Sequence, residues 1–234
     1  MVNVPETTYD YEVSLLRAYF TSAIREMETS LTRLSVTEFT SAQTTATIAE
    51  IKAILALLDA NVKDWTSIYL EQAVKDGIVT SIVSLGLANT LAEATEMVKF
   101  SALNRNLVKT VIADTQSDLL QVTQNIDRKT RVAIREASAH AMRSNLAKGS
   151  VGIRTIQQDI LRALDSATKN GIVDSLGRRW RPEVYSETVA RTKLFSAQRE
   201  AVMNDAIGRD VFYVRVSRHG ATDACKQYEG KILK

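Results

Sequence analysis

The residues most able to do chemistry lie together near the C-terminus, in the segment His219-Gly-Ala-Thr-Asp223-Ala-Cys225. His219 and Cys225 are both zinc ligands by type, but a structural zinc site needs four ligands, usually grouped in pairs. These two residues supply half of such a set and are therefore weak metal candidates. Only further ligands beyond Lys234 would complete the set. No metal and no cofactor is expected, and the simpler interpretation is a loop histidine beside a small buried cysteine.

The same residues raise the question of a Cys–His nucleophile. Such a site needs the imidazole within hydrogen-bonding reach of the sulfur, together with an oxyanion hole. The sequence has a motif for neither, and Asp223 is explained as well by a turn as by orienting His219. We therefore expect no enzyme. An enzymatic Cys225 would react with thiol reagents far faster than a buried thiol does.

Three arginines, Arg178, Arg179 and Arg181, flank Trp180 in a segment that predicts a β-hairpin, with Ile172 and Val173 facing Trp180. A guanidinium group offers a planar fork of donors to phosphate. The arginines are candidates for sequence-independent contacts to the DNA backbone. The alternative is a solvated turn with Trp180 in the core, and we favour the core position for Trp180.

Glu187 and Arg191 are four residues apart on a predicted helix, in the favourable orientation for an ion pair. The apolar residues around them indicate a half-buried helix. A structural pair is therefore expected here, rather than catalysis.

Composition indicates a mainly α protein. The 234 residues include only nine Gly and two Pro, and neither type occurs between Pro5 and Gly77 or from Leu87 to Lys148. The single cysteine excludes an internal disulfide, and no apolar stretch reaches the roughly 18–20 residues that span a bilayer. Residues 1–100 carry 7 basic and 13 acidic residues, and residues 126–199 carry 15 and 7. The net charge thus changes from −6 in the first segment to +8 in the second, which favours an anionic partner for the later half.

The first hundred residues show helical periodicity interrupted by a Ser/Thr-rich loop at Ser35–Thr47. The expected helices are one over residues 8–34, a second from Ile48 to Leu58, a third from about Asn61 to a stop at Gly77, and two shorter ones separated by Gly86 and capped near Asn89 or Thr90.

A long helix is predicted from Asn104 to about Ala147. Its apolar seam needs a second long helix, from this chain or from a neighbouring copy, and we favour an intramolecular bundle. The seam consists of Val108, Ile112, Thr115, Leu119, Val122 and Ile126, and degrades beyond them into Lys129, Ala133, Glu136 and His140.

The remaining chain predicts a helix from Ser150 to Leu164, the hairpin, a helix from Pro182 to Ile207 and a strand over Val211–Ser217. The predicted strand places Phe212, Val214 and Val216 on one face. The expected fold is an extended helical body followed by a small α+β module, cut short at its C-terminus. The expected divisions are residues 1–103, 104–170 and 171–234.

Two segments resemble minor capsid proteins of tailed phages, in the Mu F-like head-morphogenesis superfamily and its minor capsid protein 2 branch. They are GIVDSLGRRWRPEVYSETVARTKLFSAQREAV and VRVSRHGATDACKQYEGKI. The likeness covers residues 104–232. The motif residues are Asp174, Gly177, Trp180, Glu187, Arg191, Thr192, His219, Gly220, Asp223, Cys225, Gly230 and Lys231.

The resemblance implies a structural virion protein of low copy number at the portal vertex, assembled in the host cytoplasm. It would assist head assembly and DNA packaging or delivery. Implied partners are the portal protein, copies of the chain itself, the major capsid protein and packaged double-stranded DNA. The alternative is a sequence-independent DNA-binding protein ejected with the genome. Family members usually continue past the Glu-Gly-Lys segment to a His-Pro-x-Cys element, which is missing here.

Overall fold

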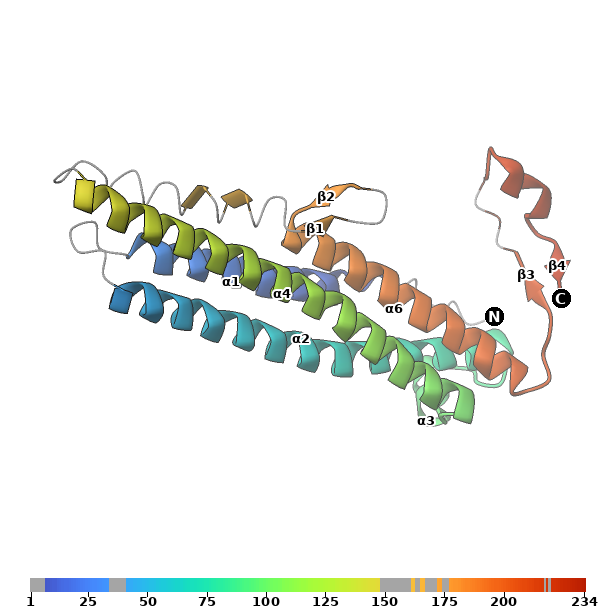
Figure 1. Cartoon of the computed structure of the whole chain (residues 1–234). Helices are drawn as coiled ribbons and strands as arrows, with labels where there is room; N and C mark the ends of the chain where they lie inside the picture. Colours follow the sequence, from blue (N-terminus) through green and yellow to red (C-terminus); the bar gives the residue numbers. More distant parts are fainter. Residues whose placement is uncertain are drawn as a thin grey trace. The chain divides into compact units, whose positions relative to one another are not determined.

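The computed structural model describes residues 7–33, 41–147, 161–162, 165–166, 172–173, 177–216, 218 and 220–234. Helices dominate this part of the chain, which confirms the mainly α fold (Figure 1). The α-helices are α1 (Asp10–Thr32), α2 (Ser41–Ser84), α3 (Leu91–Glu96), α4 (Ala102–Ala147) and α6 (Pro182–Ile207). The other elements are the strands β1 (Ile172–Val173), β2 (Arg179–Trp180), β3 (Val214–Arg215) and β4 (Ile232–Leu233), with a 3₁₀ turn, η1 (Ala224–Tyr228).

The chain forms two compact units, each assembled from separate parts of the sequence. The first consists of Met1–Pro5, Ala73–Val108 and Ser196–Lys234, and the second of Glu6–Gln72 and Lys109–Phe195. The long helices α2, α4 and α6 each contribute to both units.

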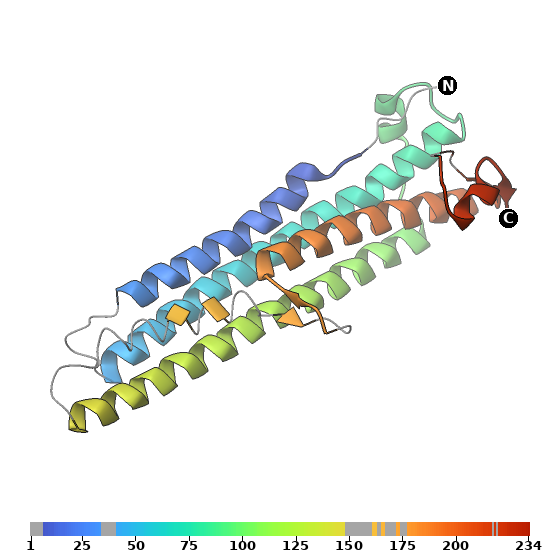
Figure 2. The ribbon, with the colours of Figure 1, turned by 90° about the horizontal axis from the view of Figure 1, so that it is seen from above.

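In the second unit, α2 and α4 run antiparallel in a constant register. The hydroxyls of Thr44 and Ser138 are 3.0 Å apart, and the Gln116 amide donates to the Thr66 hydroxyl at 2.8 Å. From the first pair to the second, α2 advances from 44 to 66 while α4 retreats from 138 to 116, which is 22 residues on each helix. The helix that covers the α4 seam is therefore one of this chain's own helices, as in the favoured intramolecular bundle (Figure 2).

Helix α1 supplies a large share of the core of the second unit. It is bound to α2 by the Trp65 indole, whose Nε1–H donates to the Glu12 carbonyl at 2.8 Å. The helix begins after Tyr9, which has a positive φ of 53° and meets Phe195 edge-on, with ring centroids 5.3 Å apart. The predicted amphipathic helix is confirmed. Its buried residues are Val13, Leu16, Phe20, Ala23, Met27, Ser30 and Leu31.

The predicted extent of α4 is confirmed, but its buried face differs from the expected seam. Val108 and Ile112 are only partly buried, because Leu107 and Val111 take the inward positions. The seam also does not end at Ile126. It continues in steps of four through Thr130 and Ile134 to Ser138. The buried positions are Asn104, Leu107, Val111, Thr115, Leu119, Val122, Thr123, Ile126, Thr130, Ile134 and Ser138.

The predicted division of α2 is wrong. One helix runs from Ser41 to Ser84, through the expected break before Asn61 and through Gly77, and it includes residues 41–47 of the expected loop. Gly77 does not end the helix, because its missing side chain serves packing: a Cβ there would lie 2.3 Å from the Gln198 carbonyl oxygen. Gly77 was interpreted as the end of a helix, but it instead permits a close approach of α6.

Helix α3 begins at the predicted cap. The Thr90 hydroxyl accepts the Glu93 N–H at 3.1 Å, and the Glu93 carboxylate accepts the Asn89 N–H at 2.8 Å. Two free N–H groups at the helix start are thereby satisfied. No helix in the described ranges is both long and apolar enough to cross a membrane.

The predicted hairpin and the helix after it are confirmed. Strands β1 and β2 pair antiparallel, with Ile172 opposite Trp180 and Val173 opposite Arg179. Pro182 is the first residue of α6, where a missing N–H costs nothing, and the helix ends at Ile207 before Gly208. The helix expected at Ser150–Leu164 lies almost wholly outside the described residues, although Leu161 and Arg162 are helical.

Candidate functional site

The C-terminal segment, residues 211–234, is held by a very short two-stranded ladder. Val214 pairs with Leu233 and Arg215 with Ile232. Two backbone bonds extend the ladder, from Val216 N to Lys231 O and from Gly230 N to Val216 O, each 2.9 Å. The strand expected over Val211–Ser217 is therefore much shorter, and Ser217 lies outside the described residues.

Both motif glycines of the C-terminal segment have backbone conformations that other residues rarely adopt. Gly220 has φ +74° and Gly230 has φ +75°. A Cβ at Gly230 would also lie 2.6 Å from the Arg218 guanidinium, whereas a Cβ at Gly220 would meet no atom within 4 Å. Gly230 is therefore required both for its conformation and for the arginine that packs over it.

Asp223 has the structural role that the sequence left open. Its carboxylate accepts the Cys225 N–H at 2.9 Å and caps η1. On the other side of the turn, the Glu229 carboxylate accepts the Ala221 N–H at 2.9 Å. Acidic residues therefore order this loop by binding backbone donors.

The expectation of a buried cysteine is wrong, because Cys225 is exposed. His219 lies outside the described residues, so the hypothesis that His219 and Cys225 are weak metal candidates stays a hypothesis. Within the described residues, no group of three or more His, Cys, Asp or Glu side chains could hold a metal ion.

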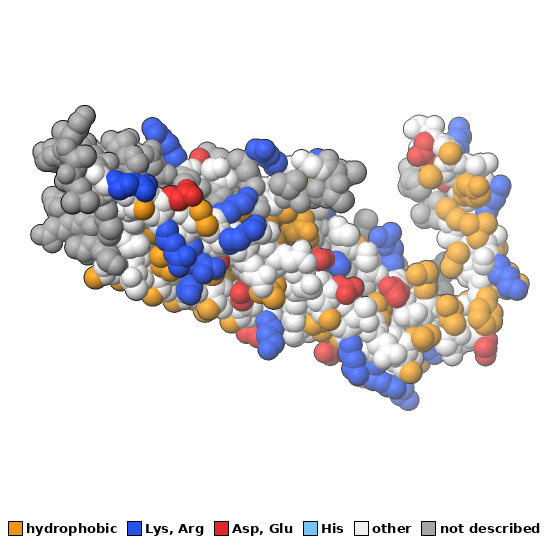
Figure 3. Space-filling model, viewed as in Figure 1, with side chains coloured by type: hydrophobic (Ala, Val, Ile, Leu, Met, Phe, Trp, Pro, Cys, Tyr) orange, Lys and Arg blue, Asp and Glu red, His pale blue; other side chains and the backbone are white. Residues whose placement is uncertain are grey.

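Large apolar side chains are exposed on both faces of the C-terminal segment. We call them the C-terminal apolar patch, and they are between 40% and 63% exposed (Figure 3). Phe212 and Val214, expected on one face of a strand, belong to this group. Lys231 lies over the Tyr228 ring, with its Nζ 5.7 Å from the centroid. The patch consists of Phe212, Tyr213, Val214, Tyr228, Ile232 and Leu233.

The arginines of the β1–β2 hairpin are exposed, but two of them have local partners. The Arg178 guanidinium lies 5.4 Å from the centre of the Trp180 ring, and Arg181 binds Glu183 at 2.7 Å. Trp180 is half-buried, with its ring edge-on to Tyr185, so it is not the core residue that we favoured. Asp174 of the predicted motif lies outside the described residues, and Gly177 adopts φ +77°.

Glu187 and Arg191 bind α1 and not each other. Arg17 donates to the Glu187 carboxylate at 2.9 Å, and Arg191 donates to Asp10 at 3.2 Å. The predicted pair within the helix is therefore corrected to two pairs between α6 and α1. Both pairs join one helix to the other. Thr192, beside them in the motif, is exposed.

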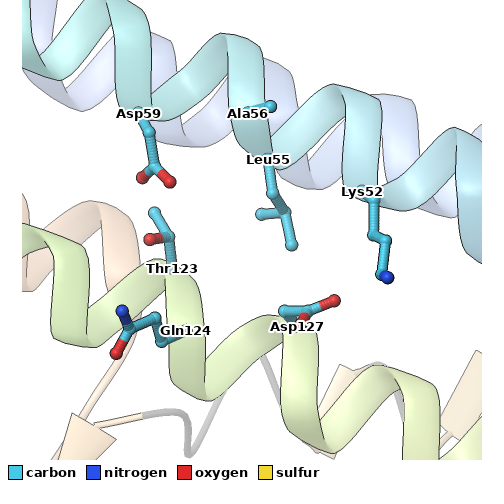
Figure 4. A pocket seen from close by; sticks show the side chains of 7 residues that line it. All are labelled: Lys52, Leu55, Ala56, Asp59, Thr123, Gln124 and Asp127. Carbon is cyan, nitrogen blue, oxygen red and sulfur yellow. The ribbon is translucent and has the colours of Figure 1, made fainter.

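An open groove of about 190 Å³ lies between α2 and α4 in the second unit (Figure 4). The Asp59 carboxylate points from α2 toward Thr123 of α4. Burial raises the pKa of Asp59, and the hydrogen bond from Thr123 opposes that shift. The lining residues are Lys52, Leu55, Ala56, Asp59, Thr123, Gln124 and Asp127.

Two features of these surfaces were missed from the sequence. The exposure of the C-terminal patch was not predicted, because the strand pattern over Val211–Ser217 does not show what covers its faces. The outward face of α4 carries Arg128, Arg135 and Arg143. Their spacing of seven and eight residues, on the side opposite the seam, was the available signal.

In the described residues, long helices pack against one another, and the motif residues order turns and join helices. The chain belongs to the phage minor capsid protein 2 family, whose model matches residues 38–234. It is thus a phage structural protein and a virion component. The match begins at residue 38, well before residue 104, which was the expected start of the likeness. It does not include α1. No curated protein and no solved structure matches the chain.

Proposed function

We propose that this protein is a minor capsid protein of low copy number that docks at the portal vertex through its C-terminal segment. From that position it assists head assembly and the packaging or delivery of DNA. Its partners are the portal protein and sister copies, and the major capsid protein lies within reach. The observation that supports docking is the C-terminal apolar patch, in a chain of a phage minor capsid family.

The patch is poorly stabilised by its own segment. An isolated two-stranded hairpin is marginally stable in water at best, and this one has two residues in each strand. Apolar patches of this kind, rimmed by polar groups, mark interaction sites. Docking on a virion protein would bury the patch and stabilise the hairpin together.

The turn chemistry of the segment supports the same function. Asp223 and Glu229 bind backbone N–H groups, and Gly230 admits Arg218. These interactions order the turn between β3 and β4, which removes part of the ordering cost of binding. The motif residues of the segment therefore act by shaping a docking element.

The test is co-expression of the full chain with the portal protein from the same genome, followed by measurement of the mass of the complex. A discrete ring complex is expected from the unaltered chain. The double variant F212S/I232S should lose most of this complex, because apolar anchors carry much of the energy of an interface. Portal rings that form without the unaltered chain would overturn the proposal.

The matched control is L57Q/I68Q on α2. These residues are 59% and 60% exposed, similar to the 49% of Phe212 and the 61% of Ile232. The control removes the same kind of exposed apolar surface outside the C-terminal segment and should keep the complex. Equal loss in both variants would assign the effect to general surface hydrophobicity and would contradict docking through the patch.

A further inference from the structure

The second half of α4 is strongly basic, whereas the first half is not. Residues 102–127 contain two basic and three acidic residues, a net charge of −1. Residues 128–147 contain five basic residues and one acidic residue, a net charge of +4. The change of sign falls within a single continuous helix, all of whose basic half belongs to the second unit.

Three of the arginines share the outward face of the helix. Arg128, Arg135 and Arg143 are separated by seven and eight residues, about two turns each. At 1.5 Å per residue the row is roughly 22 Å long. All three are exposed, on the side opposite Thr130 and Ile134. Figure 3 shows Lys and Arg side chains gathered over this half of α4.

These guanidinium groups are largely available for an external anion. Arg128 donates to the Asn125 side-chain oxygen at 3.1 Å, which leaves its charge uncompensated. Within the part of the chain that the structure describes, the nearby ion pair belongs to Arg131 and Asp127, and none involves Arg135 or Arg143. One acidic residue, Glu136, is exposed beside Arg135.

The chemistry of this face fits the backbone of a nucleic acid duplex. Double-stranded DNA carries one negative charge per roughly 1.7 Å of axis, so a 22 Å row faces many phosphates. A platform for single strands needs aromatic side chains for stacking, and residues 102–147 contain no Phe, Tyr or Trp. A protein interface needs apolar anchors at its centre, and Val132 is the single large apolar residue between Arg128 and Arg135 on this face.

We propose that the face of α4 formed by Arg128, Arg135 and Arg143 binds double-stranded DNA through its phosphates, without reading sequence. The proposed site consists of other residues than the arginines of the β1–β2 hairpin. It goes beyond docking at the portal, because it assigns a surface of the bundle to the packaged genome. Packed duplex and a virion protein share the same particle, which makes the partner available.

The test is fluorescence anisotropy of a labelled 30-base-pair duplex of arbitrary sequence, titrated with the full chain at several NaCl concentrations. Binding should weaken steeply with salt, because each phosphate contact contributes about −0.9 to the slope of log K against log[NaCl]. The variant R128Q/R135Q/R143Q should bind at least about tenfold more weakly at 50 mM NaCl, with a slope flatter by about 2 to 3. Absence of binding by the unaltered chain would overturn the proposal.

Three comparisons make the result specific. The variant R25Q/R33Q/K63Q removes the same charge from exposed positions elsewhere in the second unit and should change the slope little. R128K/R135K/R143K keeps the charges and should retain most of the binding, even if the glutamine variant proves unstable. R178Q/R179Q/R181Q tests the hairpin. If R128Q/R135Q/R143Q and R25Q/R33Q/K63Q lose equal DNA affinity, the proposed site is contradicted. If polyglutamate displaces the duplex at an equal concentration of negative charge, the face is assigned to an acidic protein instead of DNA.

Discussion

Gly77 of α2 lies against Ala201 of α6 more closely than any residue with a side chain could. A Cβ at position 77 would be 2.7 Å from the Ala201 Cβ and 2.3 Å from the Gln198 carbonyl oxygen. Both distances are well below van der Waals contact. The crossing of the two helices in the first unit therefore depends on a glycine within a helix, where glycine is otherwise unfavourable.

Replacing Gly77 with alanine should destabilise the protein by about 1–3 kcal/mol, the usual cost of overpacking. In an open helix the same change would stabilise by up to about 1 kcal/mol through helix propensity. The sign of the effect on urea unfolding thus distinguishes the two situations. Ser67→Ala, an exposed position on the same helix, is the control and should stay within about 0.5 kcal/mol of the unaltered chain. A stabilised G77A would contradict the close crossing.

The sequence allowed correct prediction of the elements whose boundaries depend on local residues. The extent of α4 followed from the absence of Gly and Pro, and the start of α6 from Pro182. The continuity of α2 could not be predicted in this way. A helix stop and a close helix crossing both call for glycine, and only the tertiary partner, Ala201, distinguishes them.

The contacts of the candidate site residues could not be predicted from the local sequence. The turn residues between Gly220 and Gly230 indicated a loop, and the structure forms the turn η1 within this segment. Alternation over Phe212–Val216 indicated a strand with one apolar face. Whether such a face is covered depends on another element, which a local pattern does not encode. The partners of Glu187 and Arg191 were missed for the same reason, since Arg17 and Asp10 are about 170 to 180 residues away in the sequence.

Gly230→Ala should disrupt the C-terminal segment more than Gly220→Ala. Both glycines have φ near +75°, a conformation that costs other residues about 1–2 kcal/mol. Only at Gly230 does the added Cβ also displace the Arg218 guanidinium. Limited proteolysis should therefore cut the segment faster in G230A than in G220A, and portal co-assembly should weaken in the same order. Equal behaviour of the two variants would show that the Arg218 contact is unimportant.

Asp59 should make the second unit less stable as pH rises above the ordinary carboxyl range. Its folded-state pKa is raised, mainly by burial, so the folded state holds the proton more tightly than the unfolded state does. Stability then falls as pH rises from the unfolded pKa of 3.8 to the raised folded pKa, and the cost persists above it. Lys52 and Asp127 line the same groove, and Asp127 is paired with Arg131.

The variant D59N should therefore be more stable than the unaltered chain at pH 7, and the advantage should vanish near pH 3.5. The check is the midpoint of thermal unfolding by circular dichroism between pH 3.5 and 7. Asp64→Asn, on an exposed turn of the same helix, serves as the control for loss of a negative charge. If D59N is less stable than the unaltered chain at pH 7, its bond to Thr123 outweighs burial and the predicted sign is wrong.

Cys225 should react with a thiol reagent in the folded protein, because the side chain is exposed. One equivalent of reagent per chain should be incorporated without denaturant. The rate of labelling should be close to that of a small model thiol under the same conditions. Labelling should leave the helical circular dichroism signal unchanged, since the segment around it contributes no buried residue to the core. A rate two or more orders of magnitude above the model thiol would revive the nucleophile hypothesis.

The ion pairs between α1 and α6 should contribute little to stability individually. The side chains of Arg17 and Glu187 are 52% and 31% exposed, and pairs of this kind measure about 0.2–1 kcal/mol in double-mutant cycles. A cycle of R17M and E187Q, followed by urea unfolding, should give a coupling energy in that range that falls further in 0.5 M NaCl as screening increases. Because Phe20 and Leu16 of α1 are fully buried, Phe20→Ala should by contrast cost about 3–5 kcal/mol. A coupling energy larger than the cost of F20A would mean that α1, the helix outside the family match, is held by its charges and not by its apolar face.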